Sequence, residues 1–182
     1  MLASLVFASC KKEELGADID TKAAMQEIME AARAAAGEDV FIPVTIDGEV
    51  SKENCENKLG LTPEQFEEYA MDAYYMQAGI GTQAFEVVLA KCKDYASAKE
   101  AKSLAAKGYD PKKLICALPE QCFAIESGRF LFIGFLYDNT AEIFLNAFKA
   151  QFETEAGETN KFYERGDEEP EEGGLGGLLI PG

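Results

Sequence analysis

The side chains best suited to catalysis in this 182-residue chain are carboxylates, because the sequence contains no histidine. Without imidazole, Ser-His and Cys-His nucleophile pairs are excluded, and transition-metal sites lose their commonest ligand. Two acids that face one cleft can still hydrolyse a glycoside. Glu64, Glu67 and Glu68 are the candidates, but acids on a short amphipathic helix are typical of a solvated face. We therefore predict no catalytic, cofactor-binding or metal-binding residues, and a carboxylate-dependent hydrolase stays an alternative.

Three tyrosines and two short motifs have both a functional and a structural interpretation. Tyr69, Tyr74 and Tyr75 could stack on sugar rings, but strand tyrosines more often pack within the fold. The glycines in residues 79–81 lack the lysine of a phosphate-binding loop, so they predict a hairpin loop. Residues 18–20 lack the glycine and the terminal glutamate of a calcium loop, so they predict a helix cap. We expect no cofactor.

The chain has five cysteines, at positions 10, 55, 92, 116 and 122, and none of them forms a CxxC redox motif. If Cys10 is modified, the remaining four allow three disulfide pairings. Cys116 and Cys122 are nearest in sequence, but a bridge would require their Cα atoms to lie within about 7 Å. We expect Cys92 and Cys122 to be buried free thiols, since both fall in predicted strands.

The charge balance limits the partners. Seventeen basic and 33 acidic residues give a net charge of -16, which repels phosphate backbones and anionic headgroups, so we expect no nucleic-acid partner. The strongest apolar run, residues 130–137, is far shorter than the roughly 20 residues of a membrane-spanning helix. Any attachment to a membrane must therefore use an anchor.

Such an anchor is indicated near the start of the chain, where an apolar run ends in Phe7-Ala8-Ser9-Cys10. These residues resemble the lipobox of bacterial lipoproteins, whose cysteine receives a diacylglyceryl group. Two acyl chains bury enough methylenes, at about 0.8 kcal/mol each, for stable anchoring. We predict that Cys10 is lipidated and that residues 1–17 are a truncated signal followed by a polar tether. The alternative is a cytoplasmic protein that starts at Met1, since nine residues are fewer than a signal needs.

Apolar spacing and capping residues predict the first elements. Residues 21–36 form a helix that Asp20 caps, and residues 41–46 form a short extended segment whose proline favours an edge or an irregular position. A loop covers residues 47–58. Thr62 and Gln65 then make a capping box for a short helix that ends near Tyr69.

The order strand, strand, helix follows twice. Strands are predicted at 72–78, 84–92, 121–126 and 130–137, with Glu126 facing Arg129 across the second turn. Asp94 or Ser97 caps a helix over 98–107, and a capping box at 139–142 starts the last helix. The fold class is α+β: an antiparallel sheet of about four to five strands with helices packed on it and a possible ββα-ββα pseudo-repeat. Residues 130–137 form a central strand covered on both faces.

Composition changes near the end of the chain. Residues 151–182 hold nine acidic and two basic residues, and the end is rich in glycine. Such a segment has too few apolar residues to build a core. We predict a single domain over 18–157 and a disordered acidic tail over 158–182.

Several of these features together resemble a known family. Four features together are similar to those of small Gram-positive bacterial lipoproteins. They are the lipobox-like Phe7 to Cys10, the Asp20-capped helix, the sequence Leu59-Gly60-Leu61-Thr62-Pro63-Glu64, and the segment Leu89 to Asp94 before a helix. That family is known only as a domain of unknown function. The resemblance covers about Asp18 to Phe152 and implies an extracytoplasmic, lipid-anchored protein, without catalytic residues.

The sequence thus predicts a lipid-anchored binding or scaffold module at the cell envelope, on the outer face of the cytoplasmic membrane. Its partner would be a protein or the cell wall. Two alternatives stay open: a carboxylate-dependent envelope hydrolase, and a structural or assembly protein that uses an exposed sheet edge.

Overall fold

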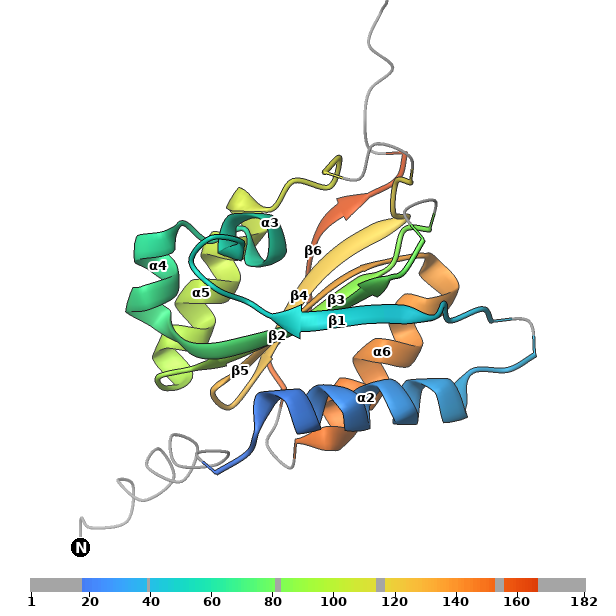
Figure 1. Ribbon diagram of the computed structural model, residues 1–182, viewed down its shortest axis with the longest axis horizontal. Helices are drawn as coiled ribbons and strands as arrows, with labels where there is room; N and C mark the ends of the chain where they lie inside the picture. Colours follow the sequence, from blue (N-terminus) through green and yellow to red (C-terminus); the bar gives the residue numbers. More distant parts are fainter. Residues whose placement is uncertain (1–17, 39, 81–82, 114–116, 153–155, 167–182) are drawn as a thin grey trace, which may run out of the picture.

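The structure, a computed structural model, describes residues 18–38, 40–80, 83–113, 117–152 and 156–166. Cys10, the tether and the chain after residue 166 lie outside these residues. The described chain forms a six-stranded antiparallel sheet with helices on both faces (Figure 1). The strand order β1-β2-β3-β5-β4-β6 places β1 and β6 at the two edges.

The α+β class is confirmed, with six strands where four to five were predicted. The strands are β1 (Thr45–Glu49), β2 (Ala70–Ala78), β3 (Glu86–Cys92), β4 (Gln121–Ser127), β5 (Phe130–Leu136) and β6 (Asn160–Glu164). The helices are α2 (Thr21–Ala35), α3 (Cys55–Leu59), α4 (Pro63–Tyr69), α5 (Tyr95–Gly108) and α6 (Asp138–Gln151).

The predicted caps of α2 and α4 are confirmed, and of the two caps proposed for α5 the structure shows Asp94, so this helix begins at Tyr95 and not at residue 98. Asp20 and Asp94 each accept a hydrogen bond from the backbone N–H three residues further on, at 2.8 and 2.7 Å. These bonds satisfy N–H groups that have no partner inside α2 and α5. Thr62 and Gln65 form the predicted capping box of α4.

The capping box predicted at 139–142 is wrong. The helix α6 begins at Asp138, after the cap residue Tyr137, whose side chain makes no capping hydrogen bond. Thr140 Oγ1 donates instead to the backbone oxygen of Tyr137 at 2.8 Å. The helix starts earlier because the N–H of Asp138 finds an acceptor elsewhere in the fold, the carboxylate of Glu120 at 2.8 Å.

The predicted pair between Glu126 and Arg129 is also not the contact that the structure shows. Glu126 is buried on the sheet face beneath α5 and forms an ion pair with Lys102 of that helix. Arg129 lies on the turn between β4 and β5 and donates to the backbone oxygen of Lys93. In the folded chain, Glu126 and Arg129 therefore each contact a residue from another part of the sequence and not each other.

The fold also contains segments that the sequence patterns placed in loops or in the tail. The predicted loop 47–58 includes the end of β1 and the start of α3. The domain extends past residue 157, because β6 pairs with β4 over part of the predicted tail. Both β1 and β6 are short, polar edge strands, so neither shows the apolar run of a buried strand.

The strand β5 is central and buried on both faces, as predicted. Gly134 within it allows a close approach: a Cβ atom there would lie 2.4 Å from ring carbons of Phe123 on β4. The neighbouring strand can therefore place an aromatic ring over the middle of β5.

The two faces of the sheet bury different side chains, and Figure 1 shows α2 and α6 on one side and α3, α4 and α5 on the other. We call the side under α2 and α6 the aromatic face, because it holds seven of the eight phenylalanines that are buried in the described part of the chain. We call the other side the ion-bearing face. Small alanine and cysteine side chains dominate it, together with the buried carboxylates of Glu86 and Glu126 and their lysine partners.

The order ββα does occur twice, as β2-β3-α5 and β4-β5-α6. The helices of the two units cover opposite faces, since Ala98 and Ala101 of α5 pack on the ion-bearing face and Phe144 and Phe148 of α6 pack on the aromatic face. Among the described residues, no helix has the length and apolar character that a membrane crossing requires.

Candidate functional site

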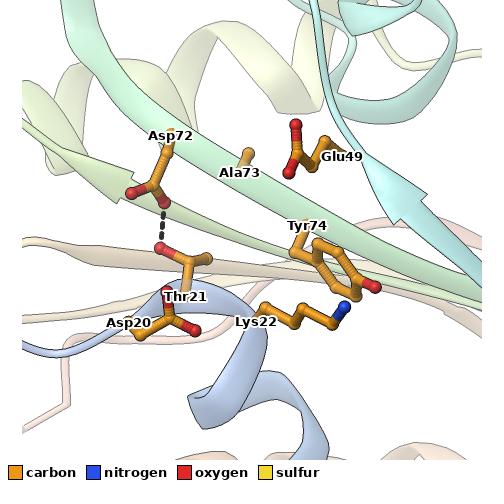
Figure 2. A pocket seen from close by; sticks show the side chains of 7 residues that line it. All are labelled: Asp20, Thr21, Lys22, Glu49, Asp72, Ala73 and Tyr74. Atoms are coloured by element: carbon orange, nitrogen blue, oxygen red, sulfur yellow. Dashed lines mark hydrogen bonds between the residues drawn. The ribbon is translucent and has the colours of Figure 1, made fainter.

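Three features of the structure could carry function: an acidic cleft, a buried ion cluster and an exposed sheet edge. The acidic cleft lies between the start of α2 and strands β1 and β2, and Figure 2 shows it from close by. Its volume is about 130 Å³. The side chains around it are Asp20, Thr21, Lys22, Glu49, Asp72, Ala73 and Tyr74.

The polar side chains of the acidic cleft other than Glu49 have partners within the fold. Asp20 caps α2, and Asp72 accepts a hydrogen bond from the hydroxyl of Thr21 (Figure 2). The ammonium of Lys22 lies 5.5 Å from the centre of the Tyr74 ring. The cleft thus ties the start of α2 to the sheet through short polar contacts.

The hydroxyl of Tyr74, another side chain of the acidic cleft, is held by a hydrogen bond to β1. It donates this hydrogen bond to the carboxylate of Asp47. This hydrogen bond, followed by burial and by the charge of Asp47, raises the pKa of Tyr74 to about 12. At neutral pH the phenol is therefore a hydrogen-bond donor and not a base or nucleophile.

The buried ion cluster lies on the ion-bearing face and is centred on Glu86 of β3, which is 2% exposed. Lys58 of α3 approaches one carboxylate oxygen at 2.6 Å, and Lys113 forms an ion pair with the other. The hydroxyl of Tyr109 donates to that second oxygen at 2.9 Å, and Lys58 also contacts the amide oxygen of Gln77. The carboxylate is surrounded by donors.

Elements far apart in the sequence bring these groups together. Gln77, Glu86 and Phe135 are successive neighbours across β2, β3 and β5, so their side chains point to the same face. Two glycines let α3 and α5 close over that row: a Cβ on Gly108 would lie 2.1 Å from the backbone oxygen of Gly60. This contact places Lys58 and Tyr109 above Glu86.

Burial and the central carboxylate set the protonation of the cluster. Burial lowers the pKa of Lys113, although the charge of Glu86 acts in the opposite direction. Burial, then the charge of Glu86, raises the pKa of Tyr109 well above its ordinary value. Burial raises the pKa of the Cys122 thiol to about 12. A carboxylate that accepts from two lysines and a phenol, beside a protonated thiol, makes a structural anchor.

The exposed sheet edge is β1, which within the described part of the chain has a strand neighbour on one side only. Of the five large apolar side chains that are more than half exposed in the described chain, four lie around it: Phe41, Val44, Ile46 and Ile80. The backbone N–H of Gly79 donates to the oxygen of Val44 at 2.9 Å, so the β2–β3 turn is adjacent to the start of β1. We call these four residues the β1 patch.

The structure separates the residues that the sequence offered as catalytic or sugar-binding candidates. Glu64, Glu67 and Glu68 lie on the exposed side of α4, as the solvated-face interpretation expects. Tyr74 belongs to the aromatic face, whereas Tyr69 and Tyr75 pack against the ion-bearing face. The three tyrosines therefore form no common stacking surface.

The cysteines agree with the thiol prediction where they are described. Cys55, Cys92 and Cys122 are free and buried, so Cys122 forms no bridge. Cys10 and Cys116 lie outside the described residues. Among the described residues, no group of three or more acids and cysteines is placed to hold a metal ion.

Sequence reasoning missed the buried ion cluster. Its only local signal is Glu86, a charged residue at the start of the apolar run Ala84 to Cys92. A charge in a buried strand needs a partner, but the lysines come from segments 28 positions before and 27 positions after it. No spacing rule connects such distant positions.

Comparison with known proteins adds no relative to this picture. No protein-family model, curated protein or solved structure matches the chain. The resemblance to Gram-positive lipoproteins therefore stays a prediction.

Proposed function

We propose that the chain is a lipid-anchored binding or scaffold module at the cell envelope, acylated on Cys10 and held at the outer face of the cytoplasmic membrane. The β1 patch is its contact surface for a protein partner. The observation that carries this proposal is the concentration of exposed apolar side chains at one open edge of the sheet.

Both parts of the β1 edge suit a protein contact. An edge strand presents unpaired backbone groups to another polypeptide, and exposed apolar patches commonly mark protein interfaces. Val44 and Ile46 are 85% and 51% exposed, which is costly in water unless a partner covers them. The proposal gives both the backbone and the side chains of β1 a partner.

The proposed anchor leaves the domain close to the membrane. Eight residue steps separate Cys10 from Asp18, so the tether spans at most about 29 Å at about 3.6 Å per residue. The net charge of -16 repels anionic headgroups, which favours a domain that stands off the lipid surface and meets partners beside it.

The hydrolase alternative has less support from the geometry. Its best location is the acidic cleft, whose lining includes Asp20, Glu49 and Asp72. Asp20 accepts the hydrogen bond that caps α2, and Asp72 accepts a hydrogen bond from the hydroxyl of Thr21. Removing either carboxylate would therefore loosen the fold before it changed any chemistry, which is the mark of a structural role.

Mass spectrometry of the N-terminus after detergent extraction of membranes tests the anchor. We expect a diacylglyceryl adduct on Cys10, and we expect the Cys10→Ala variant to move to the soluble fraction. Cys55→Ala serves as the matched control, because this thiol is buried and free. An unmodified chain that begins at Met1 in the soluble fraction would overturn the proposal.

A further inference from the structure

The free edge of β1 has a defined set of available backbone groups. Val44 accepts from Gly79 at 2.9 Å, and the N–H of Val50 donates to Ala73 at 2.8 Å, so the even-numbered residues of this segment bond to β2. In an antiparallel ladder the alternate residues point the other way. Thr45 and Asp47 therefore direct their N–H and C=O groups toward the open edge.

The side chains of β1 favour one partner and one register for pairing at that edge. From these observations we infer that β1 pairs antiparallel with β1 of a second copy, about a two-fold axis at Thr45. Thr45 then exchanges both backbone hydrogen bonds with Thr45 of the second copy. Val44 lies opposite Ile46 of that copy, and the symmetry repeats this apolar pair.

Other registers of the same strand are less favourable. A two-fold axis at Asp47 would place two aspartates directly opposite each other and Thr45 opposite Glu49, and like charges in that position are destabilising. An axis at Ile46 would pair Thr45 with Asp47 and would place Val44 opposite Gly48, so Val44 would lose its apolar partner. The sequence Val44-Thr45-Ile46 is self-complementary about its central residue, which an edge built for an unrelated chain would not require.

The pairing is weak on its own, and in this respect the inference rests on the proposed function. A contact of about five residues per strand falls below the roughly 1,200 Å² of stable interfaces. The net charge of -16 on each copy adds repulsion. A lipid anchor on both copies offsets these costs, because it raises their effective concentration in one membrane plane.

Disulfide trapping in membranes that contain the full-length chain tests the register. In the pairing about Thr45, the two Thr45 Cα atoms are about 5.5 Å apart, within reach of a disulfide. The two Asp47 Cα atoms are offset by four residues, more than about 13 Å apart. We expect Thr45→Cys to give at least about ten times more disulfide-linked dimer than Asp47→Cys or the parent chain.

Two matched variants identify the surface in the Thr45→Cys background. Ile46→Lys should abolish the cross-link, whereas Met71→Lys should keep it, because Met71 is 58% exposed at the far end of β2. Higher salt should increase the yield by screening the repulsion between the acidic copies. A yield at Asp47→Cys equal to that at Thr45→Cys, or loss of the cross-link in both lysine variants, would overturn the inference.

The inference and the proposed function can fail separately. Lipidated Cys10 with no cross-link at Thr45→Cys rejects the second copy and keeps the anchored module. An unmodified Cys10 with a strong cross-link in purified protein at high concentration rejects the anchor and keeps the pairing. A Thr45→Pro variant, which removes an N–H that β2 does not use, should stay folded by circular dichroism and sediment as a monomer.

Discussion

The aromatic face and the ion-bearing face use different means to fill the space beneath their helices. On the aromatic face, Phe132 stacks on Phe148 with ring centres 5.1 Å apart, and Phe130 stacks on Phe152 at 4.3 Å. On the ion-bearing face, alanines let α5 approach, and long lysines reach buried carboxylates. Apolar packing tolerates small changes of shape, whereas a buried charge loses its compensation entirely when one partner is removed.

The largest expected effect is at the centre of the ion-bearing face. Glu86→Gln keeps the size of the side chain but leaves two lysines buried without a counter-charge, so we expect the free energy of unfolding to fall by about 3–5 kcal/mol. Urea denaturation measures the loss. The matched control is Glu164→Gln, which removes an exposed ion pair and should cost at most about 1 kcal/mol.

A second substitution shows whether the cost comes from unpaired charge. Adding Lys113→Met to Glu86→Gln removes one of the stranded lysines, so the double variant should regain part of the lost stability. Equal losses for Glu86→Gln and Glu164→Gln would show that the cluster is solvated and that the two faces do not differ in this way.

The next effect lies on the aromatic face and depends on shape alone. Gly134→Ala places a methyl group 2.4 Å from ring carbons of Phe123, so the ring must move, at about 1–3 kcal/mol. Calorimetry should show a lower Tm. Gly37→Ala is the control, because a Cβ there meets nothing within 4 Å. If Phe123→Leu does not relieve the cost of Gly134→Ala in the double variant, the clash is not its cause.

Alkaline pH should weaken the ion-bearing face through its buried thiols. Burial raises the pKa of Cys92 from 9.0 to about 12, so the folded state keeps a proton that the unfolded state releases. This contribution is complete below about pH 9 and is lost as the pH rises toward 12. Lys113 acts in the opposite direction, because its pKa is lowered in the folded state.

Urea midpoints between pH 8 and pH 11 test this contribution. The loss of stability with rising pH should be smaller in Cys92→Ala than in the parent chain, whatever the substitution costs at pH 8. The same pH dependence in both proteins would mean that Cys92 does not titrate differently on unfolding.

The smallest effects should be equal on the two faces. Asp20→Ala and Asp94→Ala each remove one capping hydrogen bond, from α2 on the aromatic face and from α5 on the ion-bearing face. We expect each to cost about 1 kcal/mol in urea denaturation. A much larger loss for Asp20→Ala would show that the acidic cleft depends on this carboxylate for more than the helix cap.

The sequence by itself determined the features that depend on near neighbours. Residue types within a few positions of one another predict the helix caps, the four inner strands and the burial of β5. The caps are at Asp20, Thr62 and Asp94. The α+β class follows from the order of the helices and strands. The prediction of a lipidated Cys10 is of the same kind, and the described residues do not test it.

Only the tertiary structure decided which distant residues meet. Three features depend on the strand order and on which helix covers which face. They are the ion-pair partners of Glu86 and Glu126, the separation of Tyr74 from Tyr75, and the edge positions of β1 and β6. The β1 patch is a further case, since the exposure of Val44 and Ile46 depends on how the fold surrounds β1. Short-range propensity fixes the elements, whereas burial and charge pairing depend on contacts that chain spacing does not encode.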